Sequence, residues 1–185
     1  RLAKILTVDA KCQRPSVCNA AENLIVHSAA AQFLPEIAKL LVDRGVEIRA
    51  SDRAAKILNQ AGIACKPATE LDFSTEYIDL IISVDIVDSV DDAVAFINKY
   101  GSGHSDLIVA ADPKAAETFL NGVDSATVYW NASTRFTDGF EFGLGAEIGI
   151  STDKLHARGP MGLREMCSYK YKIFGSGQTR GAPIM

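Results

Sequence analysis

The chain lacks several features that would place it in a specialised class of protein. No apolar run approaches the about 20 residues that a membrane-spanning helix needs, and the first residues show no secretory pattern. The 19 Lys and Arg residues are balanced by 23 Asp and Glu, with no basic block for nucleic acid to bind. The four cysteines are widely spaced and form no C-x-x-C pair, which argues against a zinc site. We therefore expect a cytoplasmic protein with no membrane, nucleic-acid or metal partner.

What is present is typical of a globular α/β domain. The chain has 185 residues, 48% hydrophobic and 23% charged, which is enough for one domain with its own core. Strand-like apolar runs alternate with helical stretches of roughly 10–15 residues, and this predicts a doubly wound, mostly parallel sheet with flanking helices. The predicted strands cover 24–26, 46–50, 77–87, 107–111 and 126–131, and the predicted helices cover 29–44, 53–61, 89–100 and 113–121.

The two ends of the chain differ from this pattern. Residues 1–8 are compatible with either a helix end or a strand, and the chain begins with Arg1 rather than Met, which suggests a fragment. The glycine-rich stretch 133–149 is typical of a loop that approaches a ligand or another chain closely. After it we expect a short helix at 163–166, a last strand at 169–174 and a loose tail.

Cys18 is the strongest candidate for chemistry. It follows Pro15, a favoured first helical residue, and precedes an apolar strand. We expect a short helix there, whose dipole favours the thiolate, the nucleophilic form of a thiol. The alternative is that Cys18 is a small buried hydrophobe. Glu22 lies one helical turn further on; a carboxylate there raises the thiol pKa, so we expect it to bond backbone or a substrate amine rather than act as a base.

Two further segments contain polar residues at positions suited to binding. The first runs from Val87 to Ile108 and places His104 in a glycine turn before a strand, where a hydrogen-bonding structural role is the favoured interpretation. The second contains Arg135 and Arg158, which are candidate cations for an anionic ligand. The alternative is that they form salt bridges, Arg135 with Asp138 and Arg158 with Glu147.

These segments resemble one enzyme family across nearly the whole chain. Pro-x-x-Cys-Asn-Ala, the apolar strand and His27 resemble the nucleophile region of the gamma-glutamyl phosphate reductases, also called glutamate-5-semialdehyde dehydrogenases. Residues 87–108 resemble the signature segment of the family, and 126–171 resemble its C-terminal region. Asn23 and Cys167 stand where we would expect Thr in relatives, and neither lies at the proposed chemistry.

The resemblance implies roles for particular residues. Cys18 is then the nucleophile, its backbone N–H an oxyanion donor, and Asn19, Arg135 and Arg158 bind the substrate. Glu76 stands where the wider aldehyde dehydrogenase superfamily has an acidic residue that holds the nicotinamide ribose. A surface or helix-capping carboxylate is the alternative for Glu76, and no metal ligand is implied.

The implied activity is that of a catalytic domain cut from a longer reductase. It reduces L-glutamyl 5-phosphate with NADPH to L-glutamate 5-semialdehyde in proline biosynthesis, through a thioester. Residues 1–14 lead in from an absent nucleotide-binding domain, 15–150 form the catalytic domain, and 151–185 form an interdomain and oligomerisation tail. The resemblance also implies a homo-oligomer and an association with glutamate 5-kinase, and the isolated fragment is expected to be inactive. The alternatives are an aldehyde dehydrogenase for free aldehydes and a non-catalytic assembly module.

Overall fold

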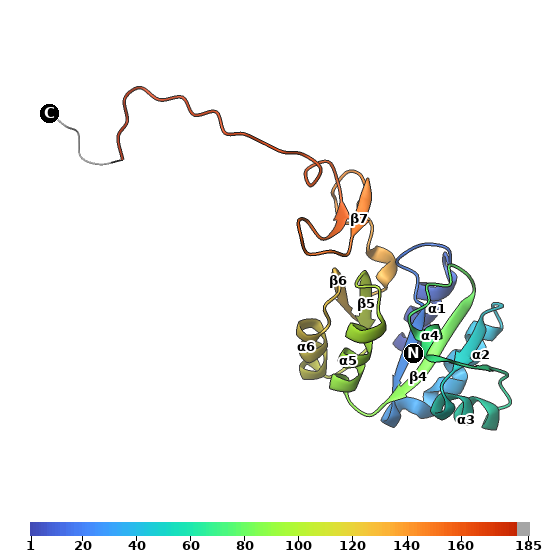
Figure 1. Cartoon of the computed structure of the whole chain (residues 1–185). Helices are drawn as coiled ribbons and strands as arrows, with labels where there is room; N and C mark the ends of the chain where they lie inside the picture. The colour runs from blue at the N-terminus through green and yellow to red at the C-terminus, as the bar shows by residue number, and fades with distance from the viewer. Residues whose placement is uncertain (181–185) are drawn as a thin grey trace.

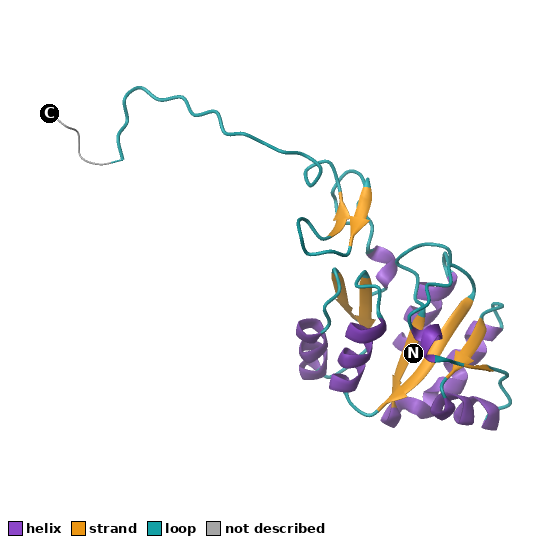
Figure 2. Ribbon diagram, viewed as in Figure 1, coloured by secondary structure: helices purple, strands orange, loops and turns teal. Residues whose placement is uncertain are grey.

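Helices and strands alternate along most of the chain in the computed structural model, which describes residues 1–180 (Figures 1 and 2). The predicted α/β class with a mostly parallel sheet is confirmed. In chain order the elements are α1 (Leu2–Cys12), β1 (Asn23–His27), the 3-10 helix η1 (Ser28–Phe33), α2 (Leu34–Val42), β2 (Glu47–Ala50), α3 (Asp52–Gln60), β3 (Lys66–Pro67), α4 (Glu70–Phe73), β4 (Ile81–Val87), α5 (Val90–Tyr100), β5 (Ser105–Ile108), α6 (Pro113–Gly122), β6 (Thr127–Trp130), the 3-10 helix η2 (Thr134–Phe136), β7 (Gly149–Ser151) and β8 (Gly159–Met161).

The main sheet has four parallel strands in the order β1-β4-β2-β3. Its central strand β4 is the near-continuous apolar run of the sequence, as expected for a strand that is covered on both faces. Ile82 and Val84 of this strand are fully buried, and they pair with Ile48 on β2 and Leu24 on β1. The hydrophobic core therefore lies between this sheet and the helices that cover it.

Local signals set the boundaries of several helices. Ser51 and Ser89 accept hydrogen bonds from backbone N–H groups in the first turns of α3 and α5, and Pro113 begins α6. The chain turns after α2 at Gly45, whose φ of +81° suits glycine. The predicted helix over 29–44 begins as the 3-10 helix η1 and becomes α-helical only at Leu34. Residues 1–8, for which the sequence left two options, belong to α1.

The second sheet contains only β5 and β6, paired in parallel and flanked by α5 and α6. Figure 1 shows this unit beside the main sheet, and within residues 1–180 no strand pairing joins β1 to β5. A cavity of about 550 Å³ is lined by residues of β1 and of β5, and it lies between these two strands. The parallel strands that the sequence predicted as a single sheet thus form two sheets.

The C-terminal region departs most from the sequence pattern. β7 and β8 form an antiparallel hairpin, and the chain beyond it extends away from the body (Figure 1). The helix predicted at 163–166 is a turn, and the strand predicted at 169–174 has no ladder among the described residues, so both predictions are wrong. A strand needs a neighbouring strand to satisfy its backbone, and this segment lies against none. The predicted loose tail ends at 181–185, outside the described residues.

Candidate active site

Three chemistry-bearing residues precede the amino ends of parallel strands. Cys18 comes before β1, Glu76 before β4 and His104 before β5. Figure 2 shows the strand arrows of both sheets starting at the end of the body where the β7–β8 hairpin lies. Cys18 and Glu76 both line the 550 Å³ cavity, so the structure brings two of the five predicted site residues together.

The turn that carries Cys18 is not a helix. Residues 14–20 form turns, closed by hydrogen bonds from Ala20 N to Val17 O at 3.0 Å and from Ala21 N to Ala10 O at 2.9 Å. The predicted helix from Pro15 is therefore wrong, because the chain returns to α1 and enters β1 before a helical turn can close. The helix-dipole argument for an activated thiol does not apply here.

The electrostatics of Cys18 follow from its surroundings. The residue is exposed, but the walls of the cavity shield part of the thiol, and this desolvation raises the pKa above its ordinary value. The negative charges of Glu147 and Glu76 raise this pKa further. Hydrogen bonding from the backbone N–H groups of Cys18 and Asn19 lowers the pKa, without reversing the direction. The pKa is thus raised, where the sequence predicted that it would be lowered.

Asn19 and Arg135 bind each other. The guanidinium Nη1 of Arg135 donates to the amide oxygen of Asn19, and its Nε donates to Gln13 Oε1 at 2.8 Å. The buried Asn19 donates in turn to Thr137 O at 2.9 Å. These bonds fasten the turn before β1 to the 3-10 helix η2 after β6. The salt bridge that the sequence offered for Arg135, to Asp138, is absent among the described residues.

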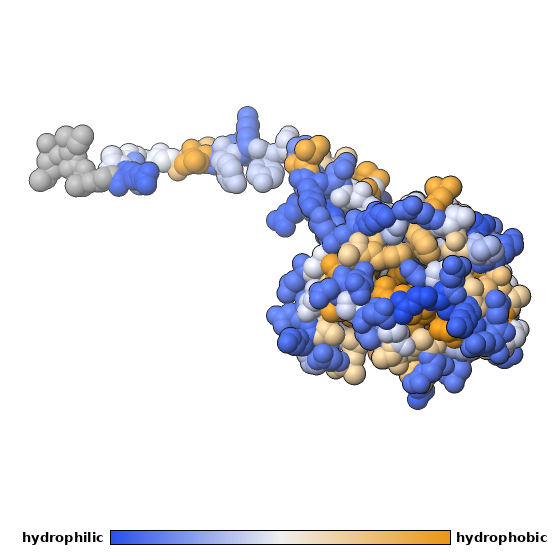
Figure 3. Space-filling view, turned by 60° about the horizontal axis from the view of Figure 1, so that its bottom comes forward, coloured by the Kyte–Doolittle hydropathy of each residue, from blue (hydrophilic) through white to orange (hydrophobic). Residues whose placement is uncertain are grey.

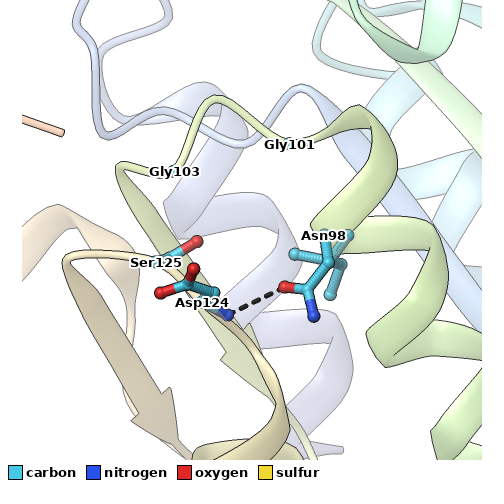
Figure 4. A pocket seen from close by; sticks show the side chains of 6 residues that line it. Asn98, Gly101, Gly103, Asp124 and Ser125 are labelled. Atoms are coloured by element: carbon cyan, nitrogen blue, oxygen red, sulfur yellow. Dashed lines mark hydrogen bonds between the residues drawn. The ribbon is translucent and has the colours of Figure 1, made fainter. Parts of the chain in front are cut away.

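Arg158 lies further along the same edge and fastens the C-terminal hairpin. It donates to Asp124 twice, from Nη1 to Oδ1 at 2.9 Å and from Nη2 to the backbone oxygen at 2.6 Å, and from Nε to Thr152 O at 3.2 Å. Its carboxylate partner is thus Asp124, not Glu147. Asp124 also lines a small pocket of about 190 Å³, in which its N–H donates to Asn98 (Figure 4). Arg158 therefore connects the hairpin to the loop before β6.

Glu147 is a residue of the site that the sequence analysis named only as a salt-bridge partner. It lies close enough to Cys18 to raise the pKa of the thiol, and it accepts a hydrogen bond from Gly139 N at 2.8 Å. A Cβ on Gly139 would lie 2.3 Å from the carbonyl oxygen of Ala146, so only glycine permits this close approach. The glycines of 133–149 were the signal of such a loop, but they did not reveal which side chain it presents.

The segment with Glu76 is held by polar contacts on both sides. Asn23 donates to Phe73 O at 2.9 Å, and the hydroxyl of Tyr77 donates to Asp72 Oδ1 at 2.9 Å. Glu76 itself is exposed at the cavity. An exposed carboxylate on a fixed segment can accept hydrogen bonds from hydroxyl groups of a ligand in the cavity.

Glu22 has a structural partner. Its carboxylate pairs with Lys11 of α1 at 2.9 Å, and Lys11 is fully buried. Burial raises the pKa of Glu22, and the hydrogen bond and charge of Lys11 oppose this shift. Glu22 is therefore a partner for the ammonium of this buried lysine, beside the cavity that it helps to line.

The described residues contain neither a metal-binding cluster nor a membrane-spanning helix. Across residues 1–180, no three His, Cys, Asp or Glu side chains gather in a way that could hold a metal ion. None of the helices in that range is long and apolar enough to span a membrane.

The fold and site define a class of protein. No family model matches the chain. An acetylating aldehyde dehydrogenase from Geobacillus thermoglucosidasius has the same fold, with a TM-score of 0.61 at 17% identity over 96% of this chain and 48% of that chain. The architecture is therefore that of the aldehyde dehydrogenases, and the exposed Cys18 stands at the amino edge of its sheet.

Comparisons at higher identity are with one family of reductases. The gamma-glutamyl phosphate reductase of Caldicellulosiruptor bescii is 60% identical over 180 residues, which are 97% of this chain and 43% of that protein. The crystal structure of the Thermotoga maritima gamma-glutamyl phosphate reductase has a TM-score of 0.88 at 48% identity, over 97% of this chain and 43% of that chain. The chain is thus similar over nearly its whole length to gamma-glutamyl phosphate reductases, and it spans less than half the length of these relatives.

Proposed function

We propose that this chain is the catalytic part of a reductase that converts L-glutamyl 5-phosphate to L-glutamate 5-semialdehyde and phosphate, a step of proline biosynthesis. The observation that carries the proposal is the exposed Cys18, placed on a fixed turn in a cavity that it shares with Glu76. We assign the catalytic domain to 15–150, the lead-in from a nucleotide-binding part to 1–14, and an interdomain and oligomerisation tail to 151–185.

The chemistry starts with the thiolate of Cys18. It attacks the carbonyl carbon of the acyl phosphate, the bond from that carbon to the phosphate oxygen breaks, and phosphate leaves with the electron pair. A thioester on Cys18 results. We assign the backbone N–H groups of Cys18 and Asn19, which lower the pKa of the thiol, as donors for the charge that develops on the carbonyl oxygen.

NADP(H) is the cofactor that we assign to the whole enzyme. When bound, its nicotinamide supplies the hydride that reduces the thioester to the aldehyde. Within this chain, Glu76 is the residue placed to accept hydrogen bonds from its ribose hydroxyls.

We assign negative and positive side chains to different parts of the substrate. The carboxylates of Glu147 and Glu76 act on Cys18 and suit the ammonium of a glutamyl group. We also assign Asn19, on the turn that carries Cys18, and Arg135 of η2 to substrate binding; the hydrogen bond between them holds the two side chains together. Arg158 contributes by holding the hairpin in place, and it becomes a direct ligand only if a substrate displaces Asp124.

The tail is the part that we assign to assembly. Tyr171, Ile173 and Phe174 are 83%, 91% and 92% exposed on an extended segment, where a second copy of the chain can cover them. We therefore propose a homo-oligomer in the cytoplasm, and a functional association with glutamate 5-kinase, whose product is the substrate.

The test joins this chain to the preceding segment of the Caldicellulosiruptor bescii relative. The reaction is followed in reverse, as NADPH formed from L-glutamate 5-semialdehyde, NADP⁺ and phosphate. We expect Cys18→Ser to lower the rate by about 1000-fold or more, while Cys167→Ser, at the other exposed cysteine, leaves the rate unchanged.

Two outcomes contradict the proposal. A folded fusion without activity supports the assembly-module alternative. Activity that needs no phosphate and yields free glutamate supports an aldehyde dehydrogenase for free aldehydes, because water then takes the place of phosphate.

A further inference from the structure

His104 has one ring nitrogen that the fold leaves without a partner. The side chain is 5% exposed, and its Nδ1 lies 2.9 Å from the hydroxyl oxygen of Ser105. Its Nε2 is buried and has no hydrogen-bond partner among residues 1–180. A buried polar atom without a partner costs about 1–3 kcal/mol, so its presence calls for an explanation.

The turn that carries His104 faces the catalytic cavity. Ser102 and Ser105, on either side of His104 in the sequence, line the same cavity as Cys18 and Glu76. The chain passes between them through Gly103, whose φ is +73°. The two serines therefore border the cavity directly, and His104 lies between them in the chain, behind the residues that line it.

This turn is held firmly in its conformation. Ala126 N donates to Gly103 O at 2.8 Å, and Thr127 N donates to His104 O at 3.1 Å. Ser102 Oγ accepts from the backbone N–H of His104 at 3.4 Å. The other face of the turn borders the small pocket of Figure 4, where the side chain of Asn98 binds the loop before β6. His104 is thus presented by a preorganised segment rather than by a free loop.

The surrounding chemistry suits a phosphate group. Within four residues the turn offers two hydroxyls and an imidazole, all of which can donate to anionic oxygens. The carboxylates that suit an ammonium act on Cys18 from Glu76 and Glu147. Burial lowers the pKa of His104, and the charge of Glu76 opposes this shift; a bound dianion would oppose it further and favour the imidazolium.

We propose that the Ser102–Ser105 turn is the phosphate subsite of the cavity, in which Nε2 of His104 donates to an oxygen of the acyl phosphate. This inference rests on the proposed function, since it names the part of the site that holds the leaving group. The hydrogen bond between Nδ1 and the Ser105 hydroxyl orients the ring, and Nε2 gains its missing partner only when the anion binds.

NMR of the 185-residue chain tests the contact directly. The sequence has only three histidines, and His156→Gln and His27→Gln assign the other two ring signals. Inorganic phosphate is expected to shift the His104 signal in a saturable way, while chloride at equal ionic strength does not. A His104 signal that phosphate leaves unmoved overturns the proposal.

Two variants separate ligand binding from a structural role. His104→Gln retains a donor near the Nε2 position, whereas His104→Asn retains one near Nδ1, the atom that contacts Ser105. Protection of Cys18 from iodoacetamide by phosphate is expected to weaken about 10- to 100-fold in His104→Asn and to persist in His104→Gln. The reverse order shows that His104 acts only through Ser105, and the proposal is then wrong.

The source of the phosphate is settled by a further titration. In Cys18→Ser, acetyl phosphate is expected to shift the His104 signal without forming a thioester, and NADP⁺ is not. If only NADP⁺ shifts the signal, the turn holds a cofactor phosphate and the assignment to the substrate is overturned. These measurements need no turnover, so their failure is distinct from an inactive fusion enzyme.

Discussion

The main sheet and the region after Ser133 are built on different principles. The core around β4 consists of apolar side chains that are almost fully buried between the sheet and its helices. After Ser133 the chain exposes Phe140, Leu155 and most of its later aromatic residues. Figure 3 shows the same contrast on the surface, with the extended C-terminal segment carrying apolar side chains clear of the body.

The difference shows what holds each region in place. The main sheet buries apolar surface against its own helices, and this burial stabilises that region without contacts from the later one. The later region is fastened to the rest of the chain by a few polar contacts, among them Arg135 on Asn19 and Arg158 on Asp124. The candidate site lies where the two regions meet. Cys18 and Glu76 belong to the first region, and Glu147, whose charge acts on Cys18, belongs to the second.

The largest expected difference between the two regions is in the effect of truncating one apolar side chain in each. Ile82→Ala removes a fully buried side chain of β4 and is expected to lower the free energy of unfolding by about 2–5 kcal/mol. Leu155→Ala removes a side chain that is 85% exposed, and is expected to change it by less than about 0.5 kcal/mol. Urea denaturation measures both. Comparable losses would show that the later region also depends on a buried core.

The next effect concerns a polar network inside the main-sheet region. Asp72 accepts from Arg49, Thr69 and Tyr77, and these bonds hold the pKa of its carboxyl well below the usual range. Asp72→Asn is expected to cost about 2–3 kcal/mol, because it removes an ion pair and the cap of α4.

The pH dependence identifies the cause of that loss. The native state holds Asp72 in its charged form, so this stabilisation is present above the carboxyl pKa of the unfolded chain and is lost as the pH falls toward the native value. Stability of the parent is therefore expected to fall more steeply below about pH 4 than that of Asp72→Asn. Thermal melts at several pH values measure this. If the melting temperatures of the parent and of Asp72→Asn fall equally as the pH is lowered, the assignment to Asp72 is wrong.

The elements that the sequence predicted correctly depend on local signals. The serine caps before α3 and α5, the proline that begins α6 and the apolar run of β4 each act within a few residues. These interactions can therefore be predicted without knowing how the rest of the chain folds. Errors arose where distant contacts decide the conformation. The turn of Cys18 is fixed by α1 and by η2, which follows it by more than one hundred residues.

In the candidate site too, the sequence was informative about single residues and uninformative about contacts between distant segments. The family resemblance singled out Cys18 and Glu76 separately, and the structure adds that both line one cavity. The partners of the arginines were not predictable, because Asp124 and Asn19 are remote in sequence from Arg158 and Arg135. The unpaired Nε2 of His104 became visible only when the packing around its turn was known.

A smaller effect is expected at the point where the hairpin is fastened. Arg158→Gln removes the ion pair to Asp124 and is expected to cost less than about 1 kcal/mol of global stability, because the Asp124 side chain is 53% exposed to water. Hydrogen exchange of the amides in β7 is expected to quicken, while exchange in β4 is unchanged. Lys154→Gln, which removes the other cation of Asp124, is the matched control and is expected to affect β7 less. Equal quickening in both strands would show that the two regions unfold as one.

The smallest effect concerns the charge that the later region places beside the thiol. Glu147→Gln removes a carboxylate that raises the pKa of Cys18, so this pKa is expected to fall and alkylation by iodoacetamide at pH 7 to quicken about two- to threefold. Glu141→Gln, on the same glycine-rich loop and also exposed, is the matched control and is expected to leave the rate unchanged. Burial is the larger cause of the raised pKa, so the thiol of Glu147→Gln still titrates above its ordinary value. Equal rates in the parent and Glu147→Gln would mean that the charge of Glu147 does not affect the reactivity of Cys18, and that this carboxylate of the later region adds nothing to the site.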